Sequence, residues 1–394
     1  MNESCYILAA EIITSLGVGL DHNWKQLLAQ QCGIRKLQRF QTGKYFSDTA
    51  GEIPLDVFDE LARKNSIEDD SKIFILSQAV IGELSKQLSG MQIDLSKHRT
   101  GLILSTTKAD IEALRPVALG ESNRPLNNYW NSSCLAQAVA DANRLTGPVM
   151  AVSNACASGI VAILLAKSIL QQNAADMMLV LGVDVLSDFV LSGFSSLVSL
   201  SKEPCKPYDA KRSGLSLGEG SGVLLLSKKS HSGYPFPAVI GGAANNDANH
   251  ITGPSRTAEG LKLALKRTLK KAGLSPDDID YINGHGTGTL YNDAMESKGI
   301  SFIFGHKSPP ITSMKGYFGH TLGAAGVIET ALCTKILNET IVPSSLGFDV
   351  LDMEDHLNVA KSTLRLKKLN NLITFKCGFG GINAAIALQK KGLS

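Results

Sequence analysis

The stretch that decides the fold is Pro148-Val-Met-Ala-Val-Ser-Asn-Ala-Cys156-Ala-Ser-Gly-Ile-Val-Ala-Ile-Leu-Leu-Ala166. Its first residues have the apolar character of a buried strand, and its last residues form a run of Ala, Ile and Leu long enough for a buried helix. The turn between them places Cys156 at a helix N-terminus, where free N–H groups and the helix dipole favour a thiolate. We therefore expect Cys156 to be either a nucleophile or a buried core cysteine, the usual fate of a free thiol.

Length and composition narrow the class of protein. The chain has 394 residues, 44% of them hydrophobic, which is enough for one large core or two fused ones. A net charge of +3 gives no overall sign of nucleic acid or an anionic membrane as a partner. We find no signal-peptide pattern and no stretch near the roughly 20 apolar residues of a membrane span. The seven cysteines contain no C-x-x-C pair, which argues against disulfides and zinc and favours a reducing cytoplasm.

Predicted strands and helices alternate along the chain. Apolar runs predict strands at residues 6–15, 101–105, 176–184, 223–227, 238–242 and 279–282. Helical periodicity predicts helices at residues 72–88, 128–146 and 258–272. Asp21 is expected to cap a further helix that carries Trp24. Continuous apolar strands that alternate with helices predict a parallel sheet covered on both faces.

One predicted helix, at residues 258–272, has a strongly basic face. Leucines recur every four residues on one side, and five lysines and arginines lie on the other. The simpler interpretation is a solvated face, and the alternative is a dock for an acidic partner.

The strongest boundary signal is residues 230–237, where a glycine and two prolines break regular structure. It divides the chain into an N-terminal half, residues 1–235, and a C-terminal half, residues 236–394. A strand, a turn and a helix rich in Ala, Gly and Ile occur around Cys156 and again around His320. A duplicated α/β unit would bring both helix N-termini, and these two residues, to a shared pseudo-symmetry axis.

Two of the eight histidines follow apolar strands in glycine-rich turns, where backbone can approach a ligand closely. They are His285, in Gly284-His-Gly-Thr-Gly288, and His320. The first loop lacks the complete G-x-G-x-x-G spacing, so we do not expect it to bind a nucleotide. Two such histidines and a cysteine at a helix N-terminus predict a site for nucleophilic catalysis.

These motifs make the chain similar to the elongating β-ketoacyl-acyl carrier protein synthases of the thiolase superfamily, over nearly its whole length. In that family the nucleophile is a cysteine in an A-C-x-S-G turn, which matches Ala155-Cys-Ala-Ser-Gly159. The first family histidine lies in an H-G-T-x-T loop that leads to an Asp and a Glu. This loop is matched by His285 to Thr289, Asp293 and Glu296.

The resemblance continues to the C-terminus. The second family histidine follows a lysine by five residues and precedes a G-A-A-G turn and a glutamate. These positions are matched by Lys315, His320 and Glu329. The family's terminal G-F-G-G-x-N motif is matched by Gly378-Phe-Gly-Gly-Ile-Asn383.

The resemblance implies a thiolase-like duplicated α/β fold with five layers and two pseudo-symmetric halves. It implies a 3-oxoacyl-[acyl-carrier-protein] synthase, an acyltransferase of fatty acid or type II polyketide or polyene biosynthesis. Cys156 would hold an acyl chain as a thioester, and neutral His285 and His320 would stabilise the enolate formed when a malonyl thioester loses carbon dioxide. The N–H groups of Cys156 and Phe379 would form the oxyanion hole, and Lys315 with Glu329 would set the electrostatics.

Substrate contacts and partners follow from the same resemblance. Phe379 would gate the acyl chain, and Gly378, Thr287 and Thr289 would contact the substrate. No metal or cofactor is expected, because the acyl carrier protein supplies the 4′-phosphopantetheine arm. The expected assembly is a homodimer or a heterodimer with a ketosynthase-like chain-length factor.

Three departures from the family pattern keep alternatives open. Cys377 and Ile382 stand where the family usually has Phe and Thr, and Ala157 stands where Thr is common. They lie near the expected acyl chain, so a specialised pathway competes with saturated fatty acids. Cys377 also lies near the place of a second thiolase cysteine, which leaves thiolase-type acyl-CoA condensation as an alternative. A silent chain-length factor is disfavoured because Cys156 is present, whereas an active subunit that needs such a partner stays open.

Overall fold

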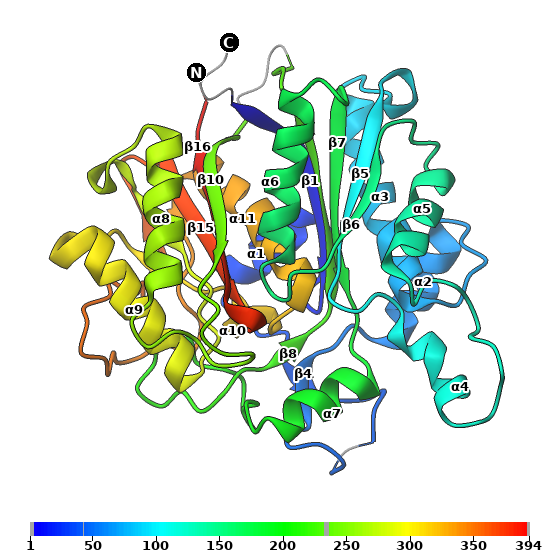
Figure 1. Ribbon diagram of the computed structural model, residues 1–394, viewed down its shortest axis with the longest axis horizontal. Helices are drawn as coiled ribbons and strands as arrows, with labels where there is room; N and C mark the ends of the chain where they lie inside the picture. Colours follow the sequence, from blue (N-terminus) through cyan, green and yellow to red (C-terminus); the bar gives the residue numbers. More distant parts are fainter. Residues whose placement is uncertain (1–3, 42, 232–235, 392–394) are drawn as a thin grey trace.

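Two five-stranded halves of one mixed β-sheet form the framework of the protein (Figure 1). The computed structural model describes residues 4–41, 43–231 and 236–391. From the centre outwards, the first half contains β1 (Cys5–Thr14), β9 (Gly220–Ser227), β7 (Met177–Asp184), β5 (Thr100–Ser105) and β6 (Val149–Val152). In the same order, the second half contains β10 (Ala238–Asn246), β16 (Ile382–Gln389), β15 (Asn371–Gly378), β11 (Tyr281–Asn283) and β12 (Ile311–Thr312). The short β2 (Gly17–Val18) pairs with β1.

The two halves repeat one topology. In each half the first strand lies at the junction, followed outwards by the fifth, fourth, second and third strands of that half. The inner neighbours pair antiparallel and the outer neighbours pair parallel, in both halves. Antiparallel pairing of β1 with β10, at Cys5↔Val239 and Tyr6↔Ala238, joins the halves. The predicted duplicated α/β fold is therefore confirmed.

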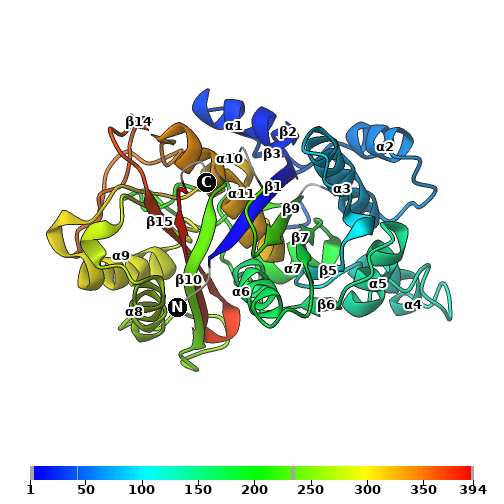
Figure 2. The same ribbon diagram turned by 90° about the horizontal axis from the view of Figure 1, so that it is seen from above.

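Helices form three further layers, which gives five layers in all (Figure 2). The outer layer on the first half contains α3 (Lys72–Gly90) and α5 (Ser132–Ala142), with α2 (Leu55–Lys64) packed on α3. The outer layer on the second half contains α8 (Glu259–Ala272) and α9 (Leu290–Phe304). The central layer contains α6 (Ser158–Gln171) and α11 (Ala325–Glu339), which contact strands of both halves.

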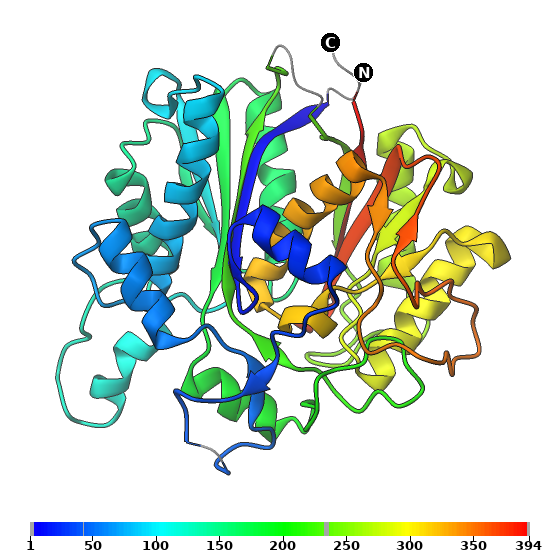
Figure 3. The same ribbon diagram turned by 180° about the vertical axis from the view of Figure 1, so that it is seen from behind.

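Shorter elements surround these layers. The remaining α-helices are α1 (Leu20–Leu28), α4 (Arg115–Ala118), α7 (Asp188–Ser196) and α10 (Lys315–Phe318). One small sheet contains β3 (Arg35–Lys36), β4 (Thr49–Gly51) and β8 (Leu217–Gly218). A second small sheet contains β13 (Ile341–Val342) and β14 (Leu364–Arg365). α1 lies against α11 (Figure 3), and Trp24 Nε1 donates to Glu339 Oε2 at 2.8 Å across this contact. Among the helices described, none has the length and apolar character needed to cross a membrane.

The central helices are apolar because they are buried from both sides. Almost every residue of α11 is buried, and α6 buries most of its Ile, Leu and Ala side chains. The two helices meet at Gly159 and Gly326, where a Cβ on Gly159 would lie 2.8 Å from Gly326 Cα. Only glycine permits this approach of backbone to backbone. The crossing brings the starts of both helices to the middle of the molecule.

The strand directions correct one prediction. In the large sheet, the expected parallel pairing is present among the described strands only at β5, β6 and β7 and at β11, β12 and β15. After β7 the chain makes a long excursion through α7 and returns as β9, which inserts between β7 and β1 in the opposite direction. The alternation of apolar strands and helices along the sequence does not predict the direction of β9 or its place between β7 and β1.

Element boundaries follow the sequence with two local corrections. The helix predicted at residues 128–146 is shorter, because Asn131 Oδ1 accepts from Ser133 and Cys134 N–H and begins α5 at Ser132. Asp21 lies inside the first turn of α1 and does not cap it; the residue before the helix is Gly19. The division between residues 235 and 236 stays a prediction, because residues 232–235 lie outside the described residues.

We predict that Gly159→Ala lowers the free energy of unfolding by about 1–3 kcal/mol, because its methyl group would overlap the α11 backbone. Gly90→Ala, at the end of α3 with no atom within 4 Å of its Cβ, is the matched control and should change stability by less than about 1 kcal/mol. Urea unfolding of both variants tests this. Equal stability of the two variants would show that the crossing tolerates a side chain.

Candidate active site

A strained turn between β6 and α6 presents Cys156. Ala155 has a left-handed backbone with φ of 48°, a conformation that costs a non-glycine residue roughly 1–2 kcal/mol. Ser158 Oγ accepts from Asn154 N–H at 2.7 Å and so holds the turn closed. Cys156 lies two residues before the first residue of α6, as the sequence predicts, and is buried.

The Cys156 sulfur is nevertheless a thiol at neutral pH. Burial raises the pKa of Cys156 to about 11, although the Lys315 charge and the backbone N–H groups of Phe379 and Cys156 lower it. The prediction that the helix N-terminus favours a thiolate at Cys156 is therefore wrong, because the net shift of the Cys156 pKa is upward. Loss of hydration outweighs the favourable charge and hydrogen bonds.

Two buried carboxylates hold the loop that carries His285. Glu296 accepts from His285 N–H at 3.1 Å and from Gly286 N–H at 2.7 Å. Asp293 accepts from Thr287 N–H at 3.0 Å and from Gly288 N–H at 3.1 Å. Burial, and for Glu296 also the Asp293 charge, raises the pKa of both groups, that of Glu296 to about 7.

His320 is fixed by its backbone and by one ring nitrogen. Its N–H donates to Ser216 O at 2.7 Å, and its carbonyl accepts from Gly218 N–H at 3.0 Å. Its Nδ1 accepts from Leu322 N–H at 3.2 Å, which assigns the ring proton of a neutral imidazole to Nε2. Nε2 has no hydrogen-bond partner within the described residues, so this N–H is free to donate to a ligand.

Cys156, His285 and His320 meet at one point. The sulfur and one nitrogen of each ring all lie within 4.8 Å of one another, and the two rings meet edge to face with centroids 5.2 Å apart. Burial and the charges of Lys315 and Lys376 hold the pKa of both histidines well below its ordinary value. Both imidazoles are therefore neutral donors. Sequence reasoning expects no metal here, and this stays a prediction.

A buried charge cluster lies behind the histidines. Lys315 Nζ lies 2.7 Å from Glu329 Oε1, and Lys376 Nζ lies 2.8 Å from Glu329 Oε2. All three side chains are at most 1% exposed. The two ammonium groups outweigh burial and hold the pKa of Glu329 below its ordinary value. One carboxylate thus bridges two lysines.

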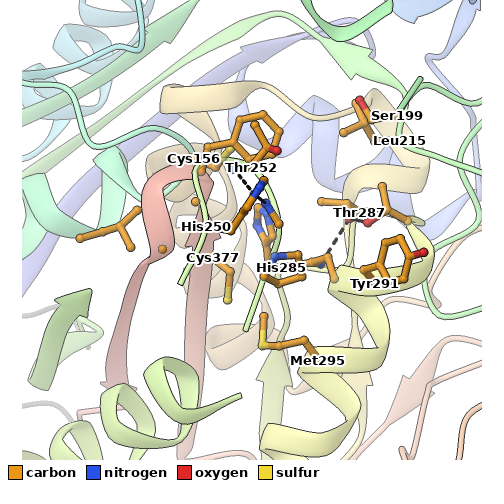
Figure 4. Close-up of a pocket in the computed structure, with 18 of the residues that line it drawn as sticks. Cys156, Ser199, Leu215, His250, Thr252, His285, Thr287, Tyr291, Met295 and Cys377 are labelled. Carbon is orange, nitrogen blue, oxygen red and sulfur yellow. Dashed lines mark hydrogen bonds between the residues drawn. The ribbon is translucent and has the colours of Figure 1, made fainter. Parts of the chain in front are cut away.

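A cavity of about 350 Å³ leads to this point (Figure 4). Thr287 and Thr289 line it, and their hydroxyl groups are 2.9 Å apart. Phe379 also lines it, stacked on Phe194 at 5.7 Å between ring centroids. Gly378 lies against the nucleophile turn, because a Cβ there would be 3.2 Å from Cys156 N. All predicted substrate-contact residues therefore border the same space.

The three departures from the family pattern, Ala157, Cys377 and Ile382, differ in whether they line the cavity. Cys377 and Ile382 line the cavity. Figure 4 shows Cys377 and Met295 on one side of His285. Ala157 is fully buried before α6 and does not line the cavity. Cys377 and Ile382 are therefore the two departures that can contact a bound substrate.

Sequence reasoning missed two buried side chains of the site. Lys376 is the second lysine that forms an ion pair with Glu329. The sequence feature that could have indicated it is a charged residue inside an apolar strand, residues 372–377. Tyr208 donates from its hydroxyl to Glu296 Oε2 at 2.8 Å and lies under the His285 loop. It stands in a polar, turn-rich stretch that carries no comparable signal.

Family models match both parts of the chain. The model described as beta-ketoacyl synthase, N-terminal domain, matches residues 2–232. The model described as beta-ketoacyl synthase, C-terminal domain, matches residues 237–349.

Individual relatives agree with these matches. The 3-oxoacyl-[acyl-carrier-protein] synthase 2 of Rhizobium meliloti is 27% identical over 98% of each chain. The mitochondrial 3-oxoacyl-[acyl-carrier-protein] synthase of Arabidopsis thaliana is 28% identical over 95% of this chain and 90% of its own. Among solved structures, the ketosynthase ApeO in complex with its chain length factor ApeC from Xenorhabdus doucetiae is 28% identical over 98% of each chain, with a TM-score of 0.83. The ishigamide ketosynthase/chain length factor has a TM-score of 0.89 over all of each chain at 24% identity, a likeness of fold.

We predict that alkylation of Cys156 by iodoacetamide accelerates about tenfold per pH unit between pH 7 and 9. A thiol with a pKa of about 11 is almost fully protonated in this range, so its thiolate fraction rises in proportion to hydroxide. Peptide mass spectrometry of the Cys156 adduct measures the rate, with Cys156→Ser as the blank. A rate that is constant across this range would indicate a thiolate.

We predict that Asp293→Asn lowers the free energy of unfolding by about 1–3 kcal/mol, because an amide nitrogen would face backbone N–H donors. It should also slow any reaction that needs His285. Asp277→Asn, on an exposed turn, is the control and should leave stability unchanged. Thermal unfolding measures both, and equal melting temperatures would contradict the supporting role of Asp293.

Proposed function

Because this chain belongs to the β-ketoacyl synthase family, we propose that it is a 3-oxoacyl-[acyl-carrier-protein] synthase that condenses a Cys156-bound acyl chain with a malonyl carrier. The observation that carries the proposal is the meeting of one thiol and two neutral imidazoles at the end of a cavity. A thiol forms thioesters, and neutral imidazoles donate hydrogen bonds to an enolate oxygen. The product is a β-ketoacyl carrier lengthened by two carbons.

The first half-reaction loads Cys156. Its sulfur attacks the acyl thioester carbonyl, the new C–S bond forms, and the carrier's sulfur leaves with the thiol proton. The negative oxygen of the tetrahedral intermediate is stabilised by N–H groups of Cys156 and Phe379, which are already directed at the sulfur. Since the resting thiol is protonated, proton loss accompanies attack.

The second half-reaction makes the carbon–carbon bond. The malonyl thioester loses carbon dioxide, and the electron pair of the broken bond passes to the thioester oxygen as an enolate. His320 Nε2–H and a His285 N–H stabilise this oxygen, with Lys315 and Glu329 behind them. The enolate carbon then attacks the acyl carbonyl on Cys156, and the collapse of that adduct releases the thiolate, which regains a proton.

The partners follow from the same proposal. The acyl carrier protein presents both substrates on phosphopantetheine, and Thr287 and Thr289 line the cavity that leads to Cys156. We propose a dimer in the cytoplasm, either of two copies or with a chain-length factor, as in the complexes named for two structural relatives. Cys377 and Ile382, on the cavity wall, favour an acyl chain other than the usual saturated one.

One observation bears on the thiolase alternative. A thiolase-type reaction would use Cys377 as a second proton-transfer group. Burial and the Glu296 charge raise the pKa of Cys377 well above its ordinary value, and among the described residues the cluster of one sulfur and two ring nitrogens contains Cys156 and not Cys377. We therefore keep decarboxylative condensation as the proposed reaction.

We predict that Cys156→Ala abolishes acyl transfer, whereas Cys377→Ala leaves condensation largely intact. The protein is incubated with carriers that bear saturated, unsaturated and aromatic chains, and then with malonyl carrier. Intact-protein mass spectrometry follows the adduct, and product analysis follows the new bond. An adduct on Cys156 that malonyl carrier discharges would support a ketosynthase, and the best donor would identify its pathway.

Other outcomes separate the alternatives. Condensation that is lost in the Cys377 variant and normal in the Cys156 variant would reverse the assignment. Formation of the Cys156 adduct from acyl-CoA, and its discharge by acetyl-CoA without loss of carbon dioxide, would favour a thiolase. If no donor forms an adduct, repeating the assay with a co-purified chain-length factor tests whether the chain is an active subunit that needs a partner.

A further inference from the structure

Lys376 occupies an unusual position for a charged side chain. It lies on β15, directly before Cys377 and the Gly378–Gly381 loop, and it is fully buried. Its Nζ donates to Asn283 Oδ1 at 3.1 Å and to Phe375 O at 2.9 Å. A buried ammonium is costly unless it is paired. Burial lowers the pKa of Lys376, and the Glu329 carboxylate opposes this shift, so the ion pair with Glu329 favours the charged form in this position.

The pairing leaves the cluster with an excess of positive charge. Lys315 and Lys376 are two ammonium groups, and Glu329 is the single carboxylate between them. A single Lys315–Glu329 pair would be neutral. With Lys376 the three side chains carry one net positive charge inside a region that water does not reach. A fixed charge in such a place acts strongly on nearby reacting groups.

Lys376 acts on the two histidines, whereas Lys315 acts on the histidines and also on Cys156. Lys315 and Lys376 both lower the pKa of His285 and His320. The strongest influences on the Cys156 pKa are burial, Lys315, the Phe379 N–H and Asp184. We therefore expect the rate of the decarboxylation half-reaction to depend more on the Lys376 charge than the rate of Cys156 loading does.

We propose that Lys376 is a positioning residue for the decarboxylation step: it fixes Glu329 from the side opposite Lys315 and supplies the positive charge that favours an enolate oxygen between His285 and His320. This proposal rests on the proposed function. Lys376 does not contact the substrate; it acts through Glu329 and through the electrostatic potential at the two imidazoles.

The proposal has a specific pH consequence. Removing a positive charge near His285 and His320 raises their pKa, so decarboxylation should begin to fail at a higher pH on acidification. The charged and titratable groups around the two rings come from every element that meets there. They are Cys156, Asp184, Tyr208, Asp247, His250, Asp293, Glu296, Lys315, Glu329, Lys376 and Cys377.

The test compares Lys376→Met and Lys376→Gln with the wild-type protein. We expect the rate of carbon dioxide release from malonyl carrier to fall about 10- to 100-fold, the loss typical of an outer-shell partner. Acylation of Cys156, followed by mass spectrometry, should change little, and the acid limb of the decarboxylation rate should move to higher pH. Thr374→Val is the matched control: it removes a hydroxyl 3.4 Å from Lys376 Nζ and keeps the charge, so its pH profile should match the wild type.

The outcomes are distinguishable. A wild-type protein that neither loads Cys156 nor decarboxylates malonyl carrier would contradict the proposed function itself. A working wild type with equal acylation, decarboxylation and pH profile in the Lys376 variants would overturn the role of Lys376. Equal losses in both half-reactions, or two variants that fail to fold, would also overturn it in favour of a purely structural lysine.

Discussion

The contact on which the structure depends is the crossing of α6 and α11 at Gly159 and Gly326. The two helices lie between two sheet halves, and a Cβ on either glycine would lie within 3 Å of the other helix's backbone. Because the backbones touch, the turn that carries Cys156 and the segment that carries His320 reach the same place. His285 joins them from the loop after β11, which Glu296 holds, so that the three atoms lie within 4.8 Å of one another. Site geometry here is set by packing in the middle of the molecule.

The same burial that fixes the geometry controls the charges. Every ionisable group at the centre loses hydration, which opposes its charged form. The carboxylate whose charged form is favoured is Glu329, between two ammonium groups, whereas the N–H donors on Asp293 and Glu296 only partly offset burial, and the pKa of both is raised. For Cys156, Lys315 and two N–H groups lower the pKa but do not outweigh burial, and for His285 and His320 the nearby lysines act in the same direction as burial, so all three groups are neutral. A neutral thiol and neutral imidazoles are thus the product of the same packing as the permanent charges behind them.

The sequence predicts those parts of this arrangement that depend on residues close together in the chain. The run after Cys156 is apolar because most of α6 is buried, and glycines flank His285 because a Cβ at either position would overlap Tyr208. Strand direction could not be predicted, since β9 inserts into the sheet after a long excursion. Neither could the Cys156 pKa, because a helix N-terminus is visible in sequence and the burial of the sulfur is not. Lys376 was missed for a related reason: a lysine in an apolar strand acquires meaning only when Glu329, 47 positions earlier, lies 2.8 Å away.

The placement of the N–H donors and of the buried charges favours the decarboxylation half-reaction over the loading of Cys156. Two neutral N–H donors, two lysines and one carboxylate surround the place where an enolate oxygen would form. The nucleophile, by contrast, remains an uncharged thiol with a pKa of about 11. Fixed dipoles and charges need no reorganisation when the reaction occurs, so they lower the barrier of the step at which they are aimed. In the proposed reaction, loading of Cys156 passes through a tetrahedral oxyanion for which the N–H groups of Cys156 and Phe379 are the donors. Decarboxylation moves the charge of the malonyl carboxylate to a more basic enolate oxygen, and the two imidazole N–H groups with the buried lysines behind them are placed to stabilise that oxygen.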